Sequence, residues 1–362
     1  MGLIRNIRSS FYSKASQYLS RAALVEGQLK NTGASFRCLF VSPSRFANYL
    51  ILKMYAQPPR VLQRRIIWIP SLKKIIKKSR NDFDMCVAVL PKKYDSYFKE
   101  IWHFKTHEWV RQFLDISSTW EDIRRGFHKN PKEAERKIRK YGFTFRITTD
   151  LSDFDRFYHD MFVPHIQNQH GPHAYIDPYD EMKPFFRKGF LLEVIEKGHA
   201  VSGGLCFVDD EMLVFRRIGV LYGDKTYIKR GAQSAIYYFI IRFAKENNFK
   251  KVDFMRSRSF LEDGVYRTKM EWGAAVHQDD ESDSWVYFFP KHSAKVVDFF
   301  KHNPLIIFTS NGLCGLLGWD STMEFSSDNK EEMIKRYYAP GIDRMMLLTT
   351  DMENLKTIDF KK

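Results

Sequence analysis

The stretch GFLLEVIEKGHAVSGGLCFVDDEMLVFRRIGV, residues 189–220, decides the fold. It contains three short apolar runs separated by turn residues, which is the pattern of consecutive antiparallel strands. A helix-periodic segment, GAQSAIYYFIIRFAKENN, follows at 231–248, and the strand-like KVDFM follows at 251–255. Three strands in a row, a long helix and a further strand predict a mixed sheet. They argue against a doubly wound parallel fold, in which a helix follows each strand.

Two helices and a strand are predicted upstream of this stretch. Thr119 with Asp122 marks the start of WEDIRRGF, and Asn130-Pro131 marks the start of KEAERKIRKYG, which Gly142 ends. The second helix is strongly basic, and such a run is most often a solvated face. Because the strand FTFRITT follows it, the helix is also a candidate to face the phosphates of a ligand.

The first half of the chain predicts another α/β unit. The runs FRCLFV, RRIIWIP and MCVAVLP have strand character, and Pro-Pro and the lysine cluster KKIIKKSR separate them as loops. We expect four segments: a basic amphipathic N-terminal segment (1–30), a first, degenerate domain with basic helices (31–140), a second domain with the active site (141–290) and a C-terminal extension packed on the core (291–362).

Positive charge gathers in the N-terminal part. The formal net charge is +15, and residues 1–140 hold 29 Lys and Arg against 11 Asp and Glu, whereas the rest holds 29 against 32. Such a segment attracts RNA, anionic lipid headgroups or pyrophosphate-linked precursors. Simple solubility is the alternative, but it does not require the charge to lie in one segment.

The N-terminal segment predicts a short basic amphipathic helix over residues 3–19. Binding to anionic membranes through residues 1–24 and docking onto the protein's own core are equally compatible with it. The segment lacks the features of a secretory signal, and no apolar stretch reaches the length of a membrane span. With four scattered cysteines, this predicts a cytoplasmic protein with buried thiols, peripheral at the inner face of the membrane.

Charged residues crowd the stretch VDFMRSRSFLEDGVYRTKMEWGA, residues 252–274. We expect Asp253 at a strand end and Arg256 to Arg258 in a loop, with a turn that returns Lys269 to the same edge as an exposed side chain. Lys269 and Arg258 would stabilise an oxyanion, and Asp253 would orient a group or accept a proton. Lys269→Ala is then expected to lower turnover without changing the thermal midpoint. The alternative is a structural ion pair of Asp253 with Arg258 and a solvated Lys269.

This stretch and two others, 120–145 and 198–219, resemble the GNAT-type acyltransferases, and more closely their Fem-like branch. The matching residues in 252–274 are Asp253-Phe254, Ser257-Arg258, Asp263-Gly264, Lys269 and Trp272-Gly273-Ala274. The resemblance covers residues 115–290 and implies an α/β (α+β) fold of tandem GNAT-like domains, with mixed, largely antiparallel sheets flanked by helices. It also implies an acyltransferase that modifies cell-wall precursors or other amines.

The turn that would hold a donor reads Arg230-Gly231-Ala232-Gln233. In GNAT proteins that use acetyl-CoA, a glycine stands where Gln233 does, and its absence hinders backbone approach to a pyrophosphate. This weakens the acyl-CoA interpretation and is compatible with an aminoacyl-tRNA donor. We expect one of the two as co-substrate and no tightly bound cofactor. A capped helix start is the plain alternative.

Further candidates for substrate binding are Tyr222, Tyr227, Arg230, Arg256 and His170. The tyrosines flank a loop expected to face the cleft, although a surface role fits each of them alone. His170 lies in VPHIQNQHGPH with His165 and His173, whose spacing does not match a zinc motif, so we expect no metal and consider one histidine as a general base.

Two function classes follow. The first is an N-acyltransferase that moves an acyl or aminoacyl group from a thioester or aminoacyl-tRNA to an amine on a cell-envelope or glycan precursor. The second is a non-catalytic module that binds RNA or a membrane surface and retains a GNAT-like fold. The sequence leaves the donor, the acceptor and the oligomeric state open.

Overall fold

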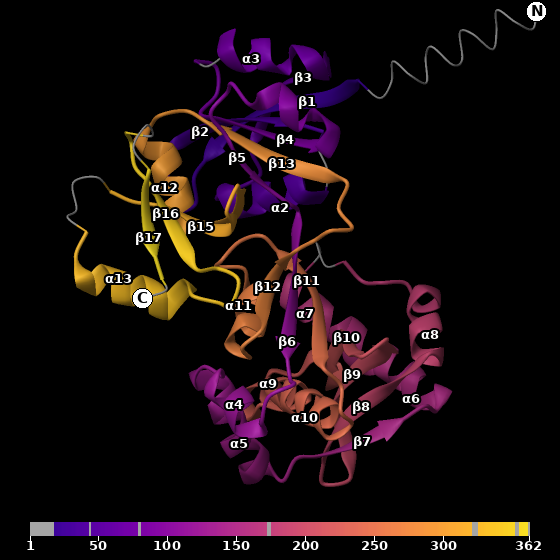
Figure 1. Ribbon diagram of the computed structural model, residues 1–362. Coiled ribbons are helices and arrows are strands. Elements are labelled where there is room, and N and C mark those ends of the chain that lie inside the picture. Colours follow the sequence, from indigo (N-terminus) through magenta and orange to yellow (C-terminus); the bar gives the residue numbers. More distant parts are fainter. Residues whose placement is uncertain are drawn as a thin grey trace, which may run out of the picture. The chain divides into compact units, whose positions relative to one another are not determined.

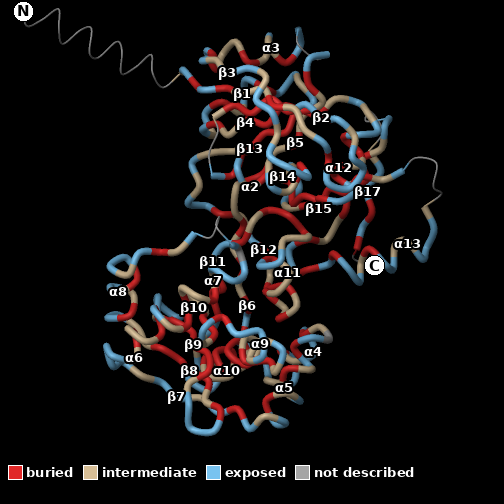
Figure 2. The backbone as a smooth tube through the Cα atoms, turned by 180° about the vertical axis from the view of Figure 1, so that it is seen from behind, coloured by how far each residue is buried: buried red, intermediate tan, exposed pale blue. Residues whose placement is uncertain are grey.

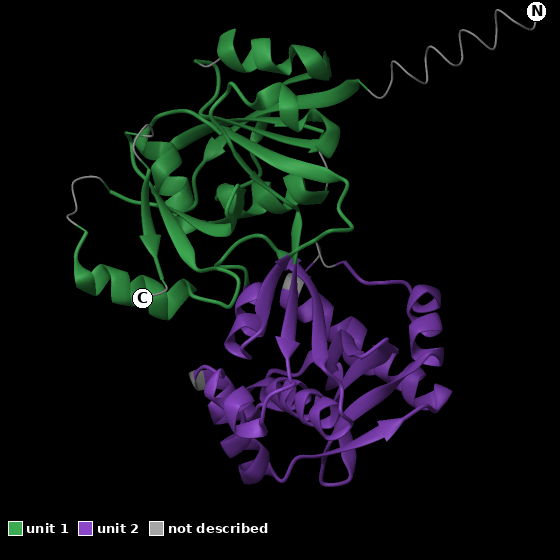
Figure 3. Cartoon of the chain, in the orientation of Figure 1, with its two compact units in different colours: residues 1–110, 258–263, 278–362 green, residues 111–257, 264–277 purple. Residues whose placement is uncertain are grey.

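The computed structural model describes residues 18–42, 45–78, 81–171, 175–320, 325–351 and 355–360, without the side chains of Lys129 and His170. The chain forms two compact units (Figure 3). Unit 1 comprises Met1–Val110, Arg258–Asp263 and Gln278–Lys362, and unit 2 comprises Arg111–Ser257 and Gly264–His277. The helix expected over residues 3–19 lies outside the described residues, apart from its end.

Unit 1 contains a six-stranded sheet in the order β3-β1-β2-β4-β13-β5 (Figure 1). Strands β2 and β4 run parallel, whereas β1 is antiparallel to β2 and β3, and β13 is antiparallel to β4 and β5. The bounds are β1 Leu19–Gln28, β2 Ser35–Val41, β3 Arg60–Trp68, β4 Met85–Pro91, β5 Phe104–Thr106 and β13 Ser284–Pro290. All of β1 therefore comes from the segment, residues 1–30, that was expected to be a separate amphipathic N-terminal segment.

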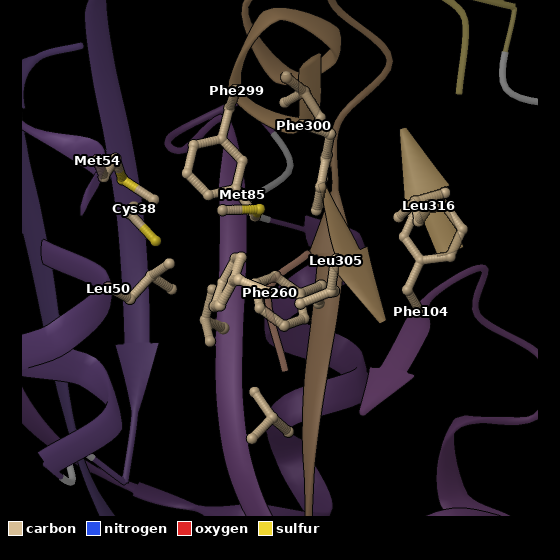
Figure 4. Close-up of a cluster of buried hydrophobic side chains, with 14 of the residues drawn as sticks. Cys38, Leu50, Met54, Met85, Phe104, Phe260, Phe299, Phe300, Leu305 and Leu316 are labelled. Atoms are coloured by element: carbon tan, nitrogen blue, oxygen red, sulfur yellow. The ribbon is translucent and has the colours of Figure 1, made fainter. Parts of the chain in front are cut away.

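Helices cover both faces of this sheet because its strands alternate apolar residues between them. On one face, α2 (Arg45–Met54) and α12 (Ala294–His302) bury Leu50 and Phe299 against Cys38 and Met85 (Figure 4). On the other face, the apolar side chains come from the 3₁₀ helices η1 and η2 and from α3. The bounds are η1 Ile69–Ser71, α3 Leu72–Lys78 and η2 Lys92–Phe98.

The C-terminal part of the chain forms a second sheet in unit 1, in the order β14-β15-β16-β17. Its strands are β14 Leu305–Thr309, β15 Gly312–Gly318, β16 Arg344–Leu348 and β17 Lys356–Asp359, and α13 spans Ser327–Tyr337. Leu305, Leu316 and Leu348 of this sheet belong to the same apolar cluster as α2 and α12. The C-terminal residues are therefore part of the core of unit 1.

The seven-stranded sheet of unit 2 has the order β12-β6-β11-β10-β9-β8-β7. Its strands are β6 Trp109–Asp115, β7 Thr144–Thr148, β8 Gly189–Glu196, β9 His199–Asp209, β10 Met212–Val220, β11 Lys251–Arg258 and β12 Ala275–Gln278. From β7 to β10, each strand is antiparallel to the next strand in the chain, whereas β10 and β11 are parallel. The predicted α/β (α+β) class, with mixed and largely antiparallel sheets flanked by helices, is confirmed.

Two layers of helices enclose this sheet, and the buried residues lie between them (Figure 2). Ile123, Ile138 and Ile240 come from α4, α5 and α10 on one face, and Phe154, Met161 and Phe186 come from α6, η3 and α8 on the other. The helix bounds are α4 Trp120–Arg125, α5 Lys129–Tyr141, α6 Leu151–Arg156, the π-helix η3 Phe157–Phe162, α7 Val163–His170, α8 Tyr179–Arg187, α9 Lys225–Arg230, α10 Ala232–Glu246 and α11 Gly264–Glu271. Helices α4 and α5, expected in the first domain, thus contribute to the core of unit 2.

Several local predictions hold. The Thr119 hydroxyl accepts a hydrogen bond from the Asp122 N–H at the start of α4, and Gly142 ends α5 in the left-handed conformation. Two local predictions are wrong: the described part of the lysine cluster, residues 73–78, belongs to helix α3 rather than to a loop, and α5 begins at Lys129 with Asn130 inside it. Helix α3 forms because Leu72 and Ile76, four residues apart, lie on one face of the helix, and both are buried in the same apolar cluster.

Candidate functional site

The sheet of unit 2 opens between β10 and β11. These parallel strands pair only at Met212, Leu213 and Val214, although both continue for several residues. Immediately afterwards the register of β10 against β9 shifts between Phe215 and Arg217, which is a β-bulge. A bulge increases the local bend of a strand, so the rest of β10 diverges from β11. Beyond Val214 this edge of β10 is not paired with β11.

A cavity of about 440 Å³ lies where β10 ends and β9 begins. Its wall includes Arg156 and Asp160, from α6 and η3, and Glu196, Lys197 and His199, from the β8–β9 hairpin; Tyr222, Tyr227 and Arg230 come from the segment before α10. The structure thus brings together three of the residues predicted for substrate binding. Glu196 and Arg156 were not predicted, because a hairpin turn and a helix end are usually charged for solubility alone.

Tyr222 owes its position to a strained turn. The 3₁₀ turn η5 (Leu221–Gly223) holds Tyr222 at φ 53° and Gly223 at φ 60°, a conformation that costs a non-glycine residue about 1 kcal/mol or more. Asn168 of α7 stabilises the turn, because its side-chain N–H groups donate to the carbonyls of Tyr222 at 3.2 Å and Gly223 at 3.3 Å. The Tyr222 side chain is 63% exposed as a result.

Arg230 lines the cavity and is held there by an ion pair and an aromatic ring. Its Nη1 lies 3.3 Å from both carboxylate oxygens of Glu196, and its guanidinium lies 5.6 Å from the centre of the Tyr141 ring. Directly after it, Gly231 adopts φ 97°, and a Cβ there would lie 2.9 Å from Cδ of Lys137. The basic helix α5 therefore lies against the start of α10. This gives the cavity an edge rich in cations and aromatic rings.

Lys269 is not an exposed loop residue, so this expectation is wrong. It lies in α11 and is only 5% exposed. Its Nζ donates to the carbonyls of Met255 at 3.4 Å and Arg256 at 2.9 Å, and to Oγ of Ser257 at 2.9 Å. The Ser257 hydroxyl donates in turn to Oε1 of Gln112 at 2.7 Å. Lys269 thus joins α11 to β11 and β6 through buried and partly buried hydrogen bonds.

Asp253 is also buried rather than at a cleft edge. Its Oδ2 lies 2.7 Å from Nη2 of Arg111 in the neighbouring strand β6, and its Oδ1 accepts from the Met255 N–H at 2.6 Å. Met255 has φ 64°, so the Asp253 carboxylate holds a strained backbone position. The sequence alone did not identify Arg111 as its partner. The catalytic role assigned to Asp253 stays a prediction.

Arg258 lies at the end of β11, not in a loop, and belongs to unit 1. Its guanidinium packs on the Trp109 ring at 3.7 Å and the Tyr49 ring at 4.8 Å, and its Nη1 lies 3.6 Å from Glu108. Burial lowers the pKa of Arg258. The expected alternative, an ion pair with Asp253, is therefore wrong, since each has a different partner.

The remaining candidates are scattered. Arg256 is exposed on β11, and its carbonyl accepts from Lys269. His165 is fully buried in α7, whereas the side chain of His170 and all of His173 lie outside the described residues. All four cysteines are buried and free, as predicted, and burial raises the pKa of Cys314 to about 11. Within the described ranges, no helix is both long and apolar enough to cross a membrane.

Solved structures similar to this chain include FemX, L-PGS from Bacillus licheniformis and a GCN5-related N-acetyltransferase from Sphaerobacter thermophilus. FemX has a TM-score of 0.40 and 10% identity, with 74% of this chain and 84% of FemX covered. L-PGS has a TM-score of 0.36 and 8% identity, with 76% of this chain and 87% of L-PGS covered. The acetyltransferase has a TM-score of 0.32 and 12% identity, with 70% of this chain and 71% of the acetyltransferase covered. No family model matches the sequence, and no curated protein is significantly similar to it.

Proposed function

We propose that unit 2 is an N-acyltransferase, which moves an acyl or aminoacyl group from a thioester or aminoacyl-tRNA to an amine. The opening of the sheet after Val214 carries this proposal. An extended donor can pair with the free edge of β10 as an added strand, because that edge presents backbone donors and acceptors. The identity of the acceptor, an amine on a cell-envelope or glycan precursor, rests on the resemblance of residues 252–274.

The cavity beyond the end of β10 suits the phosphates of such a donor. Lys197 and Arg230 supply positive charge, and a guanidinium binds phosphate oxygens in pairs. Tyr222 and Tyr227 offer rings on which a base of CoA or tRNA can stack. Both donor classes carry phosphates and bases, so the cavity fits either.

The reaction needs little covalent participation from the protein. The neutral amine attacks the carbonyl carbon, and the tetrahedral intermediate then expels the thiolate of the thioester or the ribose alkoxide of the tRNA. This leaving group takes up the proton that the amine loses, so a thiol or a tRNA hydroxyl is released. Backbone N–H groups at the bulge of β10 are the proposed donors to the oxyanion. In this scheme the residues of β10 orient the donor.

Binding of donors to the Arg230→Gln variant tests this proposal. We expect the Kd for the preferred donor to rise about tenfold, since a charge-assisted hydrogen bond contributes about 1.5 to 3 kcal/mol. Titrations use acetyl-CoA, longer acyl-CoAs and charged tRNA, with Lys229→Gln, an exposed neighbour in α9, as the control. Binding of none of these donors, together with tight salt-sensitive binding of bulk RNA, would support the non-catalytic module instead.

A second role, at a membrane surface, is favoured by the outer end of β1 and β3. Ile66 is 70% exposed there, and Leu19 and Trp68 are about half exposed and lie directly opposite each other. Arg21 stands opposite Ile66 on the same face, and Arg64 lies two residues before Ile66 in β3. Apolar and aromatic side chains interspersed with arginines fit the interface of an anionic bilayer.

Flotation with phosphatidylglycerol vesicles tests this second role. We expect the double variant Ile66→Ser, Trp68→Ser to bind at least about tenfold more weakly, because it removes the apolar part of the contact. Val208→Ser, an exposed apolar site on β9, is the control. A deletion of residues 1–17 is the matching probe of the N-terminal segment, because deleting 1–24 would remove part of β1. Wild-type binding by both variants would exclude this surface and the segment alike.

A further inference from the structure

Arg216 occupies the bulge of β10. In the register of β10 against β9, Phe215 lies opposite Cys206 and Arg217 lies opposite Leu205, so Arg216 is the extra residue of β10 with no residue of β9 opposite it. Its guanidinium carbon lies 3.6 Å from the centre of the Phe185 ring in α8. A guanidinium stacked this closely is held flat against the ring. Its N–H edge, rather than its face, is then left for a ligand.

The charge of Arg216 is not neutralised by a direct ion pair with any of the described residues. Its Nε is shielded from solvent and has no hydrogen-bond partner among them. The buried carboxylate on this face, Asp177, is bound by Nε of Arg217 instead. Burial and the charge of Arg217 lower the pKa of Arg216, while Asp177 and Glu181 act in the opposite sense. A cation in this position is stabilised by an incoming anion.

We propose that Arg216 binds one anionic group, a carboxylate or a phosphate, on a molecule that enters unit 2 beside α8. Either group can accept two parallel hydrogen bonds from the edge of the guanidinium. The bulge that carries Arg216 lies just after the last residue pair between β10 and β11. Its role in binding a substrate rests on the proposed function. An anion held there would fix one end of a transferase substrate next to the opening of the sheet.

Anion titrations of the full chain test the site without any activity measurement. Inorganic phosphate and acetate are titrated separately by calorimetry at constant ionic strength, maintained with sodium chloride. We expect saturable binding of one of them, and the tighter one shows whether the natural group is a phosphate or a carboxylate. Arg216→Gln is expected to weaken that binding at least about tenfold. The thermal midpoint of each variant verifies that it is folded.

Two controls localise the effect. Arg242 also stacks on an aromatic ring, at 5.1 Å from the centre of Trp120, but it is paired with Glu246; Arg242→Gln is therefore expected to bind anions as the wild type does. The titrations are repeated in the Arg230→Gln background, so that anions bound in the cavity do not contribute.

The outcomes separate this site from the proposed function. No saturable binding by the wild type, or equal binding by Arg216→Gln in the Arg230→Gln background, would overturn the proposal. If Arg216→Gln does not fold, Arg216→Lys decides, because it keeps the charge and loses the paired hydrogen bonds; unchanged affinity would then count against the site. Donor binding that persists while the anion site fails would leave the proposed function intact.

Discussion

Replacing Lys269 with methionine is expected to lower the free energy of unfolding of unit 2 by about 3 to 4 kcal/mol. The Nζ of Lys269 donates to two carbonyls of β11 and to the Ser257 hydroxyl. Methionine fills a similar volume but offers no donor, so the buried Ser257 hydroxyl and the two partly buried carbonyls lose this donor. For a unit of this size, the loss corresponds to a fall of about 10 °C in the thermal midpoint.

Thermal and urea unfolding of the two variants Lys269→Met and Lys229→Met provide the comparison. Lys229 is exposed on α9, so its replacement is expected to change stability by less than about 0.5 kcal/mol. A midpoint of Lys269→Met equal to that of the wild type would show that the hydrogen bonds of Lys269 contribute little to stability. Once donor and acceptor are known, turnover below the midpoint separates a catalytic from a structural role.

Asp253→Ala is expected to cost about 3 kcal/mol of unfolding free energy. The substitution leaves Arg111 without its carboxylate, and the side chain of Arg111 is only 25% exposed. It also removes the acceptor that holds the N–H of Met255 in a left-handed conformation. Urea unfolding of the wild type and the variant measures the cost.

The second of these effects can be isolated with Met255→Gly. Glycine adopts positive φ without the steric cost that methionine bears, which is about 1 kcal/mol or more. In the Asp253→Ala background, Met255→Gly is therefore expected to recover part of the lost stability. No recovery would mean that the ion pair with Arg111 accounts for the whole effect of Asp253.

Local patterns were enough to predict most elements of unit 2. The three strands within 189–220 and the helix that follows are the observed β8, β9, β10 and α10. Trp272, one of the motif residues, is buried, and its ring stacks on that of Tyr237 with the ring centres 5.7 Å apart. These features depend on alternation, helical periodicity and turn residues, which are properties of neighbouring positions in the chain.

The candidate site was predictable only in part. Tyr222, Tyr227 and Arg230 lie within nine residues of one another, so a single turn and a short helix bring them to the same cavity. Glu196 and Arg156 reach it from distant segments, and no local signal connects them with Arg230. In the same way, α4 and α5 gave clear start signals, but nothing in them identified the sheet that they cover.

The sequence by itself determined where strands and helices form, because backbone preferences and the spacing of apolar residues act over a few positions. Only the tertiary structure decided the partners of the charges. Arg111 pairs with Asp253 because β6 lies beside β11 in the sheet, and Lys269 is buried because α11 packs on the end of β11. Such pairings depend on which distant segments become neighbours when the core closes, and a carboxylate is satisfied by whichever cation that closure brings within reach.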